Sequence, residues 1–195
     1  FSIFFALVFC TDFDFNLLSF SDCLLDLGAG DGKVTSVMAN YYQKVYVTEM
    51  SSVMRKLLAK NGYFVLEIDE WHQNGLTYDL ISCLNLLDRC DKPLTMLSQM
   101  KSCLKPESGR IILGLVLPFS QYVESNVKSD HKPSEIISME GDCFESQMNS
   151  LKNNVLTPNG LIIERWTKLP YLCEGDLDLT FYWLYDVVMV LKLIN

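Results

Sequence analysis

The stretch 24-LLDLGAGDGKV-34 joins an apolar run to a glycine-rich turn. The run ends at Asp26, and Gly28, Gly30 and Gly32 then alternate with other residues before apolar positions recur at helical spacing. A strand followed by G-x-G-x-G and a helix places backbone N–H groups and a helix N-terminus around a small ligand at the carboxyl edge of a sheet. The stretch therefore predicts a nucleotide-type pocket.

The spacing of these glycines argues against a dinucleotide. In the dinucleotide fingerprint G-x-G-x-x-G, counted from Gly28, the third glycine would fall at Lys33. The observed spacing suits a cofactor that has an adenosine but no pyrophosphate, and S-adenosylmethionine is the commonest such molecule. A tight structural turn without a ligand is the alternative for the glycine pattern taken alone.

Short β-like runs alternate with helical patterns along the rest of the chain, which is typical of a parallel sheet covered by helices. The last two strands have only a short polar connection between them and are expected to pair antiparallel. We therefore expect an α/β fold with seven strands in one mostly parallel sheet, an antiparallel C-terminal strand and helices on both faces. The expected strands are 23–28, 44–50, 64–71, 78–87, 109–119, 161–172 and 186–194, and the expected helices are 34–41, 51–62, 91–106 and roughly 144–155.

The composition is that of one globular domain. The chain has 195 residues, of which 49% are hydrophobic and 21% charged, enough apolar material for a core. A formal net charge of -8 and the lack of any Lys/Arg-rich run argue against binding to nucleic acid. A basic or His-rich partner is more consistent with this charge.

Cysteines and histidines give no metal-binding pattern. The seven cysteines contain no C-x-x-C pair and mostly lie in apolar stretches, so we expect buried thiols and no structural disulfide. The two histidines, His72 and His131, lie far apart in the sequence, and no metal is expected.

The first 22 residues form a separate case. Residues 1–10 are apolar but too few to span a bilayer. They lack the positive flank and the clear small-residue cleavage site of a signal peptide. Two interpretations of this segment therefore remain: it is the remnant of a signal or anchor segment, or it forms a core helix or strand. We therefore divide the chain into an apolar segment, 1–22, and a catalytic domain, 23–195.

Acidic residues at the ends of the second and third expected strands are candidate cofactor contacts. Glu49 lies 49 − 28 = 21 positions after the first glycine, where a carboxylate can accept hydrogen bonds from both ribose hydroxyls, although a solvated surface role is the alternative. Asp69 or Glu70 lies where the adenine edge is expected. Trp71 could pack on the purine or in the core.

The fourth expected strand ends in Asn85-Leu-Leu-Asp88. In an open α/β sheet the ends of the central strands face the ligand crevice, so this polar pair points toward the reacting centre. A helix-capping role for Asp88 is the alternative. Asp91 can cap the next helix instead, which leaves Asp88 free for the site.

Five stretches together resemble a known family: LLDLGAGDG, TEMS, YDLISCLNLLDRCDKPLTML, GRIILGLVLPF and LPYLCEGD. They are similar to the DREV-type (methyltransferase-like protein 9) family of protein-histidine methyltransferases, within the Rossmann-like, seven-strand, S-adenosylmethionine-dependent class. The resemblance runs from about residue 23 to residue 195, and CLNLLDRCD and LPYLCEGD are its most specific parts. It implies methyl transfer from S-adenosylmethionine to the pros (N1) nitrogen of histidine in His-x-His protein substrates, with x small.

The resemblance also implies roles for individual residues. Asp88 and Tyr182 match positions used around the substrate histidine, with Tyr185 as the other choice because the tail after Asp176 diverges from the family. Residues 1–22 also depart from the family's usual approach to the first strand. The residues expected to hold the cofactor are Asp26, Gly28, Gly30, Glu49, Asp69, Asn85 and Tyr171, and those expected in catalysis are Asp88, Asn85 and Tyr182.

The chemistry expected at this site is displacement at a sulfonium methyl by a neutral imidazole nitrogen. With a pKa of about 6.5, most free histidine is neutral at pH 7. Asp88 could accept a hydrogen bond from the other ring nitrogen and so select the attacking one. The alternatives are a methyltransferase of the same fold with another acceptor, a non-catalytic cofactor-binding scaffold, and a nicotinamide oxidoreductase that Lys33 disfavours. The resemblance implies association with endomembranes or mitochondria.

Overall fold

A computed structural model describes residues 21–123, 131–174 and 180–194. Predictions for the segment 1–20, including Cys10, lie outside the described residues. The elements in chain order are β1 (Ser21–Leu27), α2 (Lys33–Ala39), β2 (Tyr42–Thr48), α3 (Ser52–Lys60), β3 (Phe64–Leu66), β4 (Leu80–Leu84), α4 (Pro93–Cys103), β5 (Arg110–Val116), α5 (Phe144–Ser150), the π-helical turn η2 (Leu151–Leu156), β6 (Leu161–Glu174) and β7 (Phe181–Leu193).

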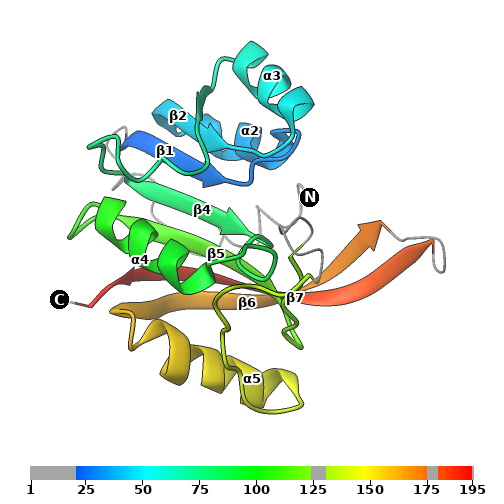
Figure 1. Ribbon diagram of the computed structural model, residues 1–195. Coiled ribbons are helices and arrows are strands. Elements are labelled where there is room, and N and C mark those ends of the chain that lie inside the picture. The colour runs from blue at the N-terminus through cyan, green and yellow to red at the C-terminus, as the bar shows by residue number, and fades with distance from the viewer. Residues whose placement is uncertain (1–20, 124–130, 175–179, 195) are drawn as a thin grey trace.

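The described strands form one seven-stranded sheet in the order β3-β2-β1-β4-β5-β7-β6 (Figure 1). Strands β1 to β5 pair in parallel, whereas β7 lies between β5 and β6 and runs antiparallel to both. The predicted fold class is confirmed. Because β7 is antiparallel, its first residues lie at the edge of the sheet where β1, β4 and β5 end.

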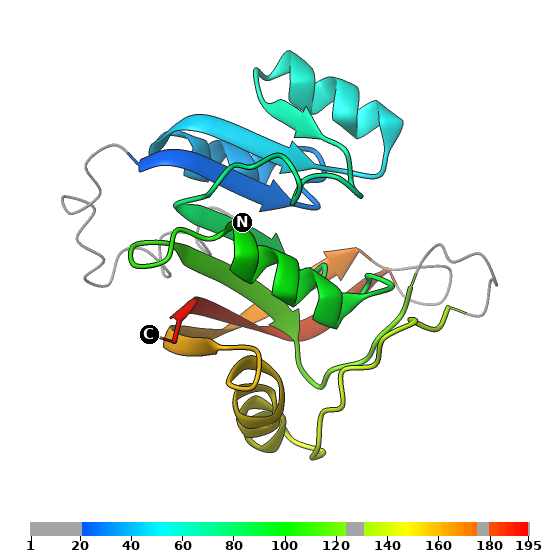
Figure 2. The ribbon, with the colours of Figure 1, turned by 60° about the vertical axis from the view of Figure 1, so that its left-hand side comes forward.

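Helices cover both faces of the sheet (Figures 1 and 2). Apolar side chains of α4, α5 and η2 pack on one face around the buried Ile81 and Leu113, and those of α2 and α3 pack on the other around Leu24 and Val47. The central parallel strands β1 and β4 are thus buried on both sides, as their continuous apolar sequences predict, whereas the edge strand β3 is partly exposed.

Two strands are shorter than predicted because the chain turns earlier. Beyond β3 the N–H groups of Glu70 and Trp71 both donate to the carbonyl of Glu67 and form a turn. The strand therefore ends at Leu66, and residues 67–71 are not part of it. Strand β4 ends at Leu84 because Asn85 adopts the left-handed conformation, with φ of 50°. The predicted strands 64–71 and 78–87 were therefore too long.

The prediction that Asp91 caps α4 is wrong. The N-cap residue is Lys92, and its side chain makes no capping hydrogen bond to the helix. The Asp91 carboxylate accepts instead from the backbone N–H of Ser134 at 2.8 Å. The backbone N–H of Thr95 donates at 2.8 Å to Glu135, so the cap comes from a loop some forty positions along the chain.

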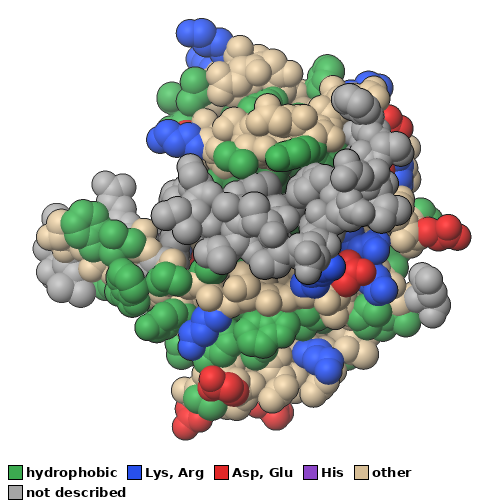
Figure 3. Space-filling model, turned by 180° about the vertical axis from the view of Figure 1, so that it is seen from behind, with side chains coloured by type: hydrophobic (Ala, Val, Ile, Leu, Met, Phe, Trp, Pro, Cys, Tyr) green, Lys and Arg blue, Asp and Glu red, His purple; other side chains and the backbone are tan. Residues whose placement is uncertain are grey.

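Strands β6 and β7 extend past the rest of the sheet as a two-stranded ribbon. Pairing between β5 and β7 stops at Val116 with Asp186, whereas pairing between β6 and β7 continues to Glu174 with Phe181 (Figure 1). The predicted strands 161–172 and 186–194 were thus too short at the ends that form this ribbon. Apolar side chains gather on the projecting part (Figure 3). The large apolar side chains on the projecting part are between 45% and 63% exposed, and they are Leu172, Phe181, Trp183 and Tyr185.

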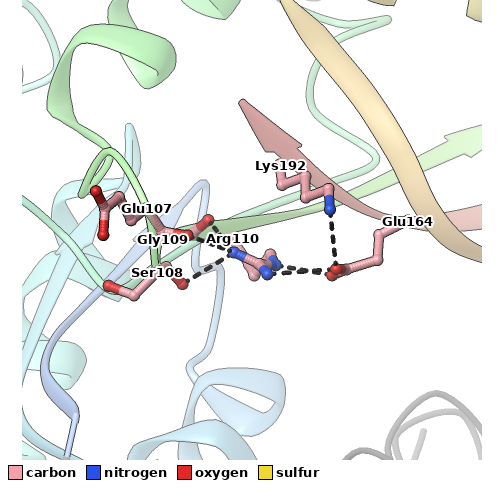
Figure 4. Close-up of polar contacts among 6 residues, drawn as sticks. All are labelled: Glu107, Ser108, Gly109, Arg110, Glu164 and Lys192. Carbon is pink, nitrogen blue, oxygen red and sulfur yellow. Dashed lines mark hydrogen bonds and ion pairs between the residues drawn. The ribbon is translucent and has the colours of Figure 1, made fainter. Parts of the chain in front are cut away.

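At the edge of the sheet opposite the glycine turn, the Glu164 carboxylate of β6 contacts side chains of β5 and β7 (Figure 4). Arg110 of β5 donates through Nε to its carboxylate at 2.7 Å, and Lys192 Nζ of β7 lies 3.7 Å from it. Arg110 also donates to the backbone carbonyls of residues 107–109. These contacts tie the last two strands to β5 far from the glycine turn.

The cysteines with described side chains are free thiols, and Cys23, Cys83 and Cys103 are buried as expected. Burial raises the pKa of Cys90 to about 12, so this half-buried thiol stays protonated. In the described part of the chain, no helix is long and apolar enough to cross a bilayer.

Candidate active site

The glycine turn after β1 has an open side. Gly28, Gly30 and Gly32 have φ of 70°, 56° and 78°, which is the left-handed region that side chains disfavour. A Cβ atom added to Gly30 would meet no atom within 4 Å, so the space beside Gly30 is open. The N–H groups of Gly28 and Ala29 donate to the Thr48 side chain and carbonyl at 3.2 and 3.0 Å, which hold the turn against β2.

Glu49 follows β2 and lies at this turn. One carboxylate oxygen accepts from the N–H of Gly30 at 3.0 Å and the other from the N–H of Ser51 at 2.8 Å. The half-buried carboxylate therefore borders the open side of Gly30, and each oxygen keeps a second lone pair for a ligand. The structure brings together the two sequence features that predicted a ribose contact.

Asp26 lies beneath the turn. Its side chain is 4% exposed and accepts a hydrogen bond from the Thr35 hydroxyl of α2 at 2.6 Å. Burial raises the pKa of Asp26 to about 6, although the Thr35 hydrogen bond opposes this shift. In this arrangement Asp26 joins β1 to α2 and shapes the turn from below.

The residues after β3 divide into exposed and buried groups. Asp69 and Glu70 are exposed, three and four positions beyond the end of β3 at Leu66. Trp71 is 3% exposed and belongs to the core on the α4 face. Of the two interpretations of Trp71, core packing describes the structure.

Asn85 and Asp88 follow β4 beside the glycine turn. Leu86 approaches so closely that a Cβ atom on Gly28 would lie 3.2 Å from its side chain. Asp88 is 9% exposed, and its Oδ1 accepts no hydrogen bond from the described residues. Burial raises the pKa of Asp88, partly opposed by Arg89, whose Nε lies 4.0 Å from Oδ2.

Sequence reasoning missed Asp186 as a site residue. Asp186 is 2% exposed and accepts from Asn85 Nδ2 at 2.9 Å through Oδ2. The other oxygens of this pair, Asn85 Oδ1 and Asp186 Oδ1, are buried without a partner among the described residues. A signal was present in the sequence, because an acidic residue that begins an antiparallel C-terminal strand lies at the edge where the parallel strands end.

These features fit an adenosine cofactor with an amino-acid end. The space beside Gly30 lies next to a carboxylate suited to ribose hydroxyls. Farther along the same edge, oxygens of Asn85, Asp88 and Asp186 have no partner in the described part of the chain and offer acceptors to groups that carry N–H or positive charge. These acceptor oxygens would repel an anionic pyrophosphate.

A sequence model of the DREV methyltransferase family matches residues 4–193 of the chain. The chain belongs to the DREV methyltransferase family. It is therefore a methyltransferase, and its cofactor is S-adenosylmethionine, as the glycine spacing predicted. The match begins upstream of β1, within the segment 1–22 that was expected to depart from the family; the division of the chain at residue 22 stays a prediction.

Solved structures of methyltransferases share the fold. An S-adenosylmethionine-dependent methyltransferase from Methanosarcina mazei has 15% sequence identity and a TM-score of 0.59, with 92% of this chain and 96% of that chain covered. Magnesium protoporphyrin IX methyltransferase from Synechocystis PCC 6803, solved with bound S-adenosylmethionine, has 18% identity and a TM-score of 0.55 over 97% of this chain and 76% of that one. At these identities the likeness shows the fold alone.

The tyrosines expected from the DREV resemblance lie on the β6–β7 ribbon. Tyr171 pairs with Leu184, and Tyr182 lies on the same face of β7 as Asp186, about 13 Å along the strand. Tyr185 lies on the opposite face, where the Lys168 ammonium is 4.7 Å from its ring centroid. The face shared with Asp186 favours Tyr182 over Tyr185.

No cluster of three or more His, Cys, Asp or Glu side chains able to hold a metal ion occurs among the residues that the structure describes. His131 stacks on Tyr122, with ring centroids 4.5 Å apart, and His72 lies beside the core residue Trp71. Neither histidine is grouped with other candidate metal ligands.

Proposed function

We propose that this DREV methyltransferase is a protein-histidine methyltransferase that modifies the pros (N1) nitrogen of histidine in His-x-His motifs. The proposal rests on the family resemblance of CLNLLDRCD and LPYLCEGD and on one observation at the site. That observation is Asp88, a buried carboxylate with an unpartnered oxygen at the edge where the cofactor is expected.

A neutral imidazole needs little activation, but its two nitrogens must be distinguished. A carboxylate that accepts the N–H of the tele nitrogen holds the ring as one tautomer and leaves the pros lone pair free to attack. Asp88 Oδ1 supplies such an acceptor. A donor such as Lys or Arg at this place would instead bind the lone pair of the tele nitrogen and keep the proton on the pros nitrogen, which then has no lone pair with which to attack.

Bound S-adenosylmethionine supplies an electrophilic methyl group on a sulfonium. Transfer of this methyl to the pros nitrogen would break the sulfur–carbon bond and leave the positive charge on the imidazole ring of the substrate. Asp88 stabilises this charge at short range within a buried site, where electrostatic interactions are stronger than in water. The methylated ring then loses its N–H proton to water or to a carboxylate of the site.

Other residues bind and orient in this scheme. Glu49 accepts the ribose hydroxyls, Gly30 leaves room for the cofactor, Gly28 lets Leu86 pack against the turn, and Asp26 links β1 to α2 next to the turn. The remaining contacts carried over from the family are those of Tyr171 with the cofactor and of Tyr182 with the substrate ring. A contact of Asp69 with the adenine edge is expected from its position after β3.

The first test combines labelled S-adenosylmethionine with a peptide that carries Ala-His-Ala-His and with the same peptide in which both histidines are alanine. We expect methyl on the pros nitrogen of the histidine peptide alone, located by mass spectrometry. Methyl on another residue would contradict the histidine assignment and point to a different acceptor. Cofactor binding without any transfer would instead point to a scaffold.

Asp88→Asn tests the role of the carboxylate. We expect kcat to fall about a hundredfold, because the charge opposite the ring is lost. Glu164→Gln is the matched control, since it makes the same change at the opposite edge of the sheet and should keep the wild-type rate. A near-normal rate and unchanged site selectivity in Asp88→Asn would exclude this role.

The pH dependence of the rate tests the neutral nucleophile. Protonation of the substrate imidazole, with a pKa of about 6.5, removes the attacking lone pair. Protonation of Asp88, whose pKa burial raises, removes its charge in the same direction. We therefore expect kcat/KM to rise with pH to an optimum above 7; an optimum near 6 would count against an imidazole nucleophile.

A further inference from the structure

Asp186 is buried directly against Asn85, which is expected to contact the cofactor. The pair joins two distant parts of the chain, since Asn85 follows β4 and Asp186 begins the part of β7 that pairs with β5. Asn85 Nδ2 donates to Asp186 Oδ2 at 2.9 Å. The neutral Asn85 amide is thus the hydrogen-bond partner of Asp186, and its charged neighbour is the acidic Asp88.

The hydrogen bond decides which end of the Asn85 amide faces the ligand. A carboxylate can only accept hydrogen bonds, so the NH₂ group of Asn85 must turn toward Asp186. The carbonyl Oδ1 is then directed away from Asp186, and it is buried without a partner among the described residues. A buried amide oxygen of this kind costs free energy unless a ligand donates to it.

The backbone of Asn85 supports the same conclusion. Its φ of 50° lies in the left-handed region, which few residues with a side chain adopt. The next residue, Leu86, packs against Gly28 at the start of the glycine turn. Asn85 therefore lies one position before the residue that packs against the cofactor turn.

From this geometry we infer that Asp186 is a positioning residue that holds the Asn85 amide with its oxygen toward the cofactor, where it accepts a hydrogen bond from the α-ammonium of S-adenosylmethionine. The acceptor-only character of this edge matches that group, because an ammonium has three donors and no acceptor. The inference concerns cofactor binding and does not require histidine to be the methyl acceptor.

Asp186→Asn tests the inference by calorimetric titration with two probes. S-adenosylhomocysteine has the α-ammonium, whereas 5′-methylthioadenosine has the same adenosine and sulfur but no amino-acid end. In the variant the Asn85 amide can rotate and present its NH₂ group. We expect roughly tenfold weaker binding of S-adenosylhomocysteine, the loss of a hydrogen bond to a charged group, and unchanged binding of 5′-methylthioadenosine.

The exchanged pair, Asn85→Asp with Asp186→Asn, is the rescue variant. It keeps the hydrogen bond with its direction reversed and again leaves an acceptor oxygen at position 85, so affinity for S-adenosylhomocysteine should return. Glu164→Gln, at the opposite edge, should bind both probes as the wild type does. Thermal unfolding of each variant verifies that it is folded.

Three outcomes would overturn the inference. Asp186→Asn could bind S-adenosylhomocysteine within twofold of the wild type, or lose both probes equally, which would indicate a general structural role. The exchanged pair could fold and yet bind as weakly as the single variant. Because neither probe is a methyl donor, failure of the histidine assignment leaves this test intact.

Discussion

At the residue scale, the carboxylates of the site and the carboxylate of Glu164 at the opposite edge of the sheet have opposite couplings between pH and stability. Asp26 and Asp88 are buried, and their raised pKa values mean that the fold holds their charges at a cost. Glu164, in its contact with Arg110, has a lowered pKa and favours the charged form. The buried carboxylates of the site therefore lower the stability of the fold relative to neutral side chains at the same positions. Such a cost is common at sites where a ligand supplies the missing partner.

Asp26→Asn should show this cost directly. The pKa of Asp26 is raised from 3.8 to about 6, so between these values the native state binds a proton that the unfolded state lacks. Stability from this group is therefore greatest in acid and falls as pH rises to 6. Urea unfolding should show Asp26→Asn gaining about 2 kcal/mol on the wild type between pH 4 and pH 7. A constant difference across that range would contradict the raised pKa.

At the element scale, α4 depends on a residue outside it. Glu135 accepts from the Thr95 backbone N–H, one of the first-turn groups that lack a helical partner. Burial would raise the pKa of Glu135, but the Thr95 hydrogen bonds outweigh it and lower the pKa. The loop that follows β5 is held to α4 in this way, near the Asp88 carbonyl, which accepts from the Tyr122 N–H at 2.9 Å.

Glu135→Ala should cost about 1 kcal/mol at pH 7, as the loss of an N-cap does. The lowered pKa means that this contribution is present above the unfolded pKa and disappears as pH falls through the folded one. Urea unfolding at pH 7 and pH 3 measures both values. Glu145→Ala, in the first turn of α5, is the control for loss of an exposed glutamate, and an equal cost in the two variants would exclude a capping role.

At the scale of the whole molecule, the acidic balance concerns how a substrate arrives. The net charge of -8 produces a field that attracts cationic peptides and weakens as salt screens it. If the substrates are His-x-His proteins, basic residues beside the motif should speed encounter without changing the chemistry.

We therefore expect KM for a Lys-flanked His-x-His peptide to rise severalfold between about 0.05 and 0.5 M salt, with kcat unchanged. Steady-state kinetics on this peptide and on a Ser-flanked one separate the effect from general salt inhibition. Equal salt dependence for both peptides would show that the overall charge does not guide the substrate.

The sequence was a good guide where the information is local. The glycine turn, the helix limits at Ser51 and Gly62 and the number of strands follow from short patterns, and the structure has them. Ser51 caps α3 by accepting from the Met54 N–H at 3.4 Å. Strand limits failed at Glu67 and Asn85 because a single carbonyl or backbone angle ends the strand, and apolar composition does not report either.

Contacts between distant parts of the chain were beyond local patterns. The cap of α4 moved from Asp91 to Glu135 because the loop after β5 folds back on the helix. The contact between Asn85 and Asp186 spans 101 positions. Only the antiparallel direction of the last strand could have placed Asp186 at the site.

The insertion of β7 between β5 and β6 also has a consequence for biosynthesis. A chain leaving the ribosome can form the glycine turn, Glu49 and the strands around them while the final strand is still being translated. Asp186 arrives with that strand, and β6 must wait for it, because β6 is joined to the sheet through β7. The half that holds the nucleoside can therefore form before the half that orients Asn85, and a nascent chain should bind adenosine compounds before it recognises their amino-acid end.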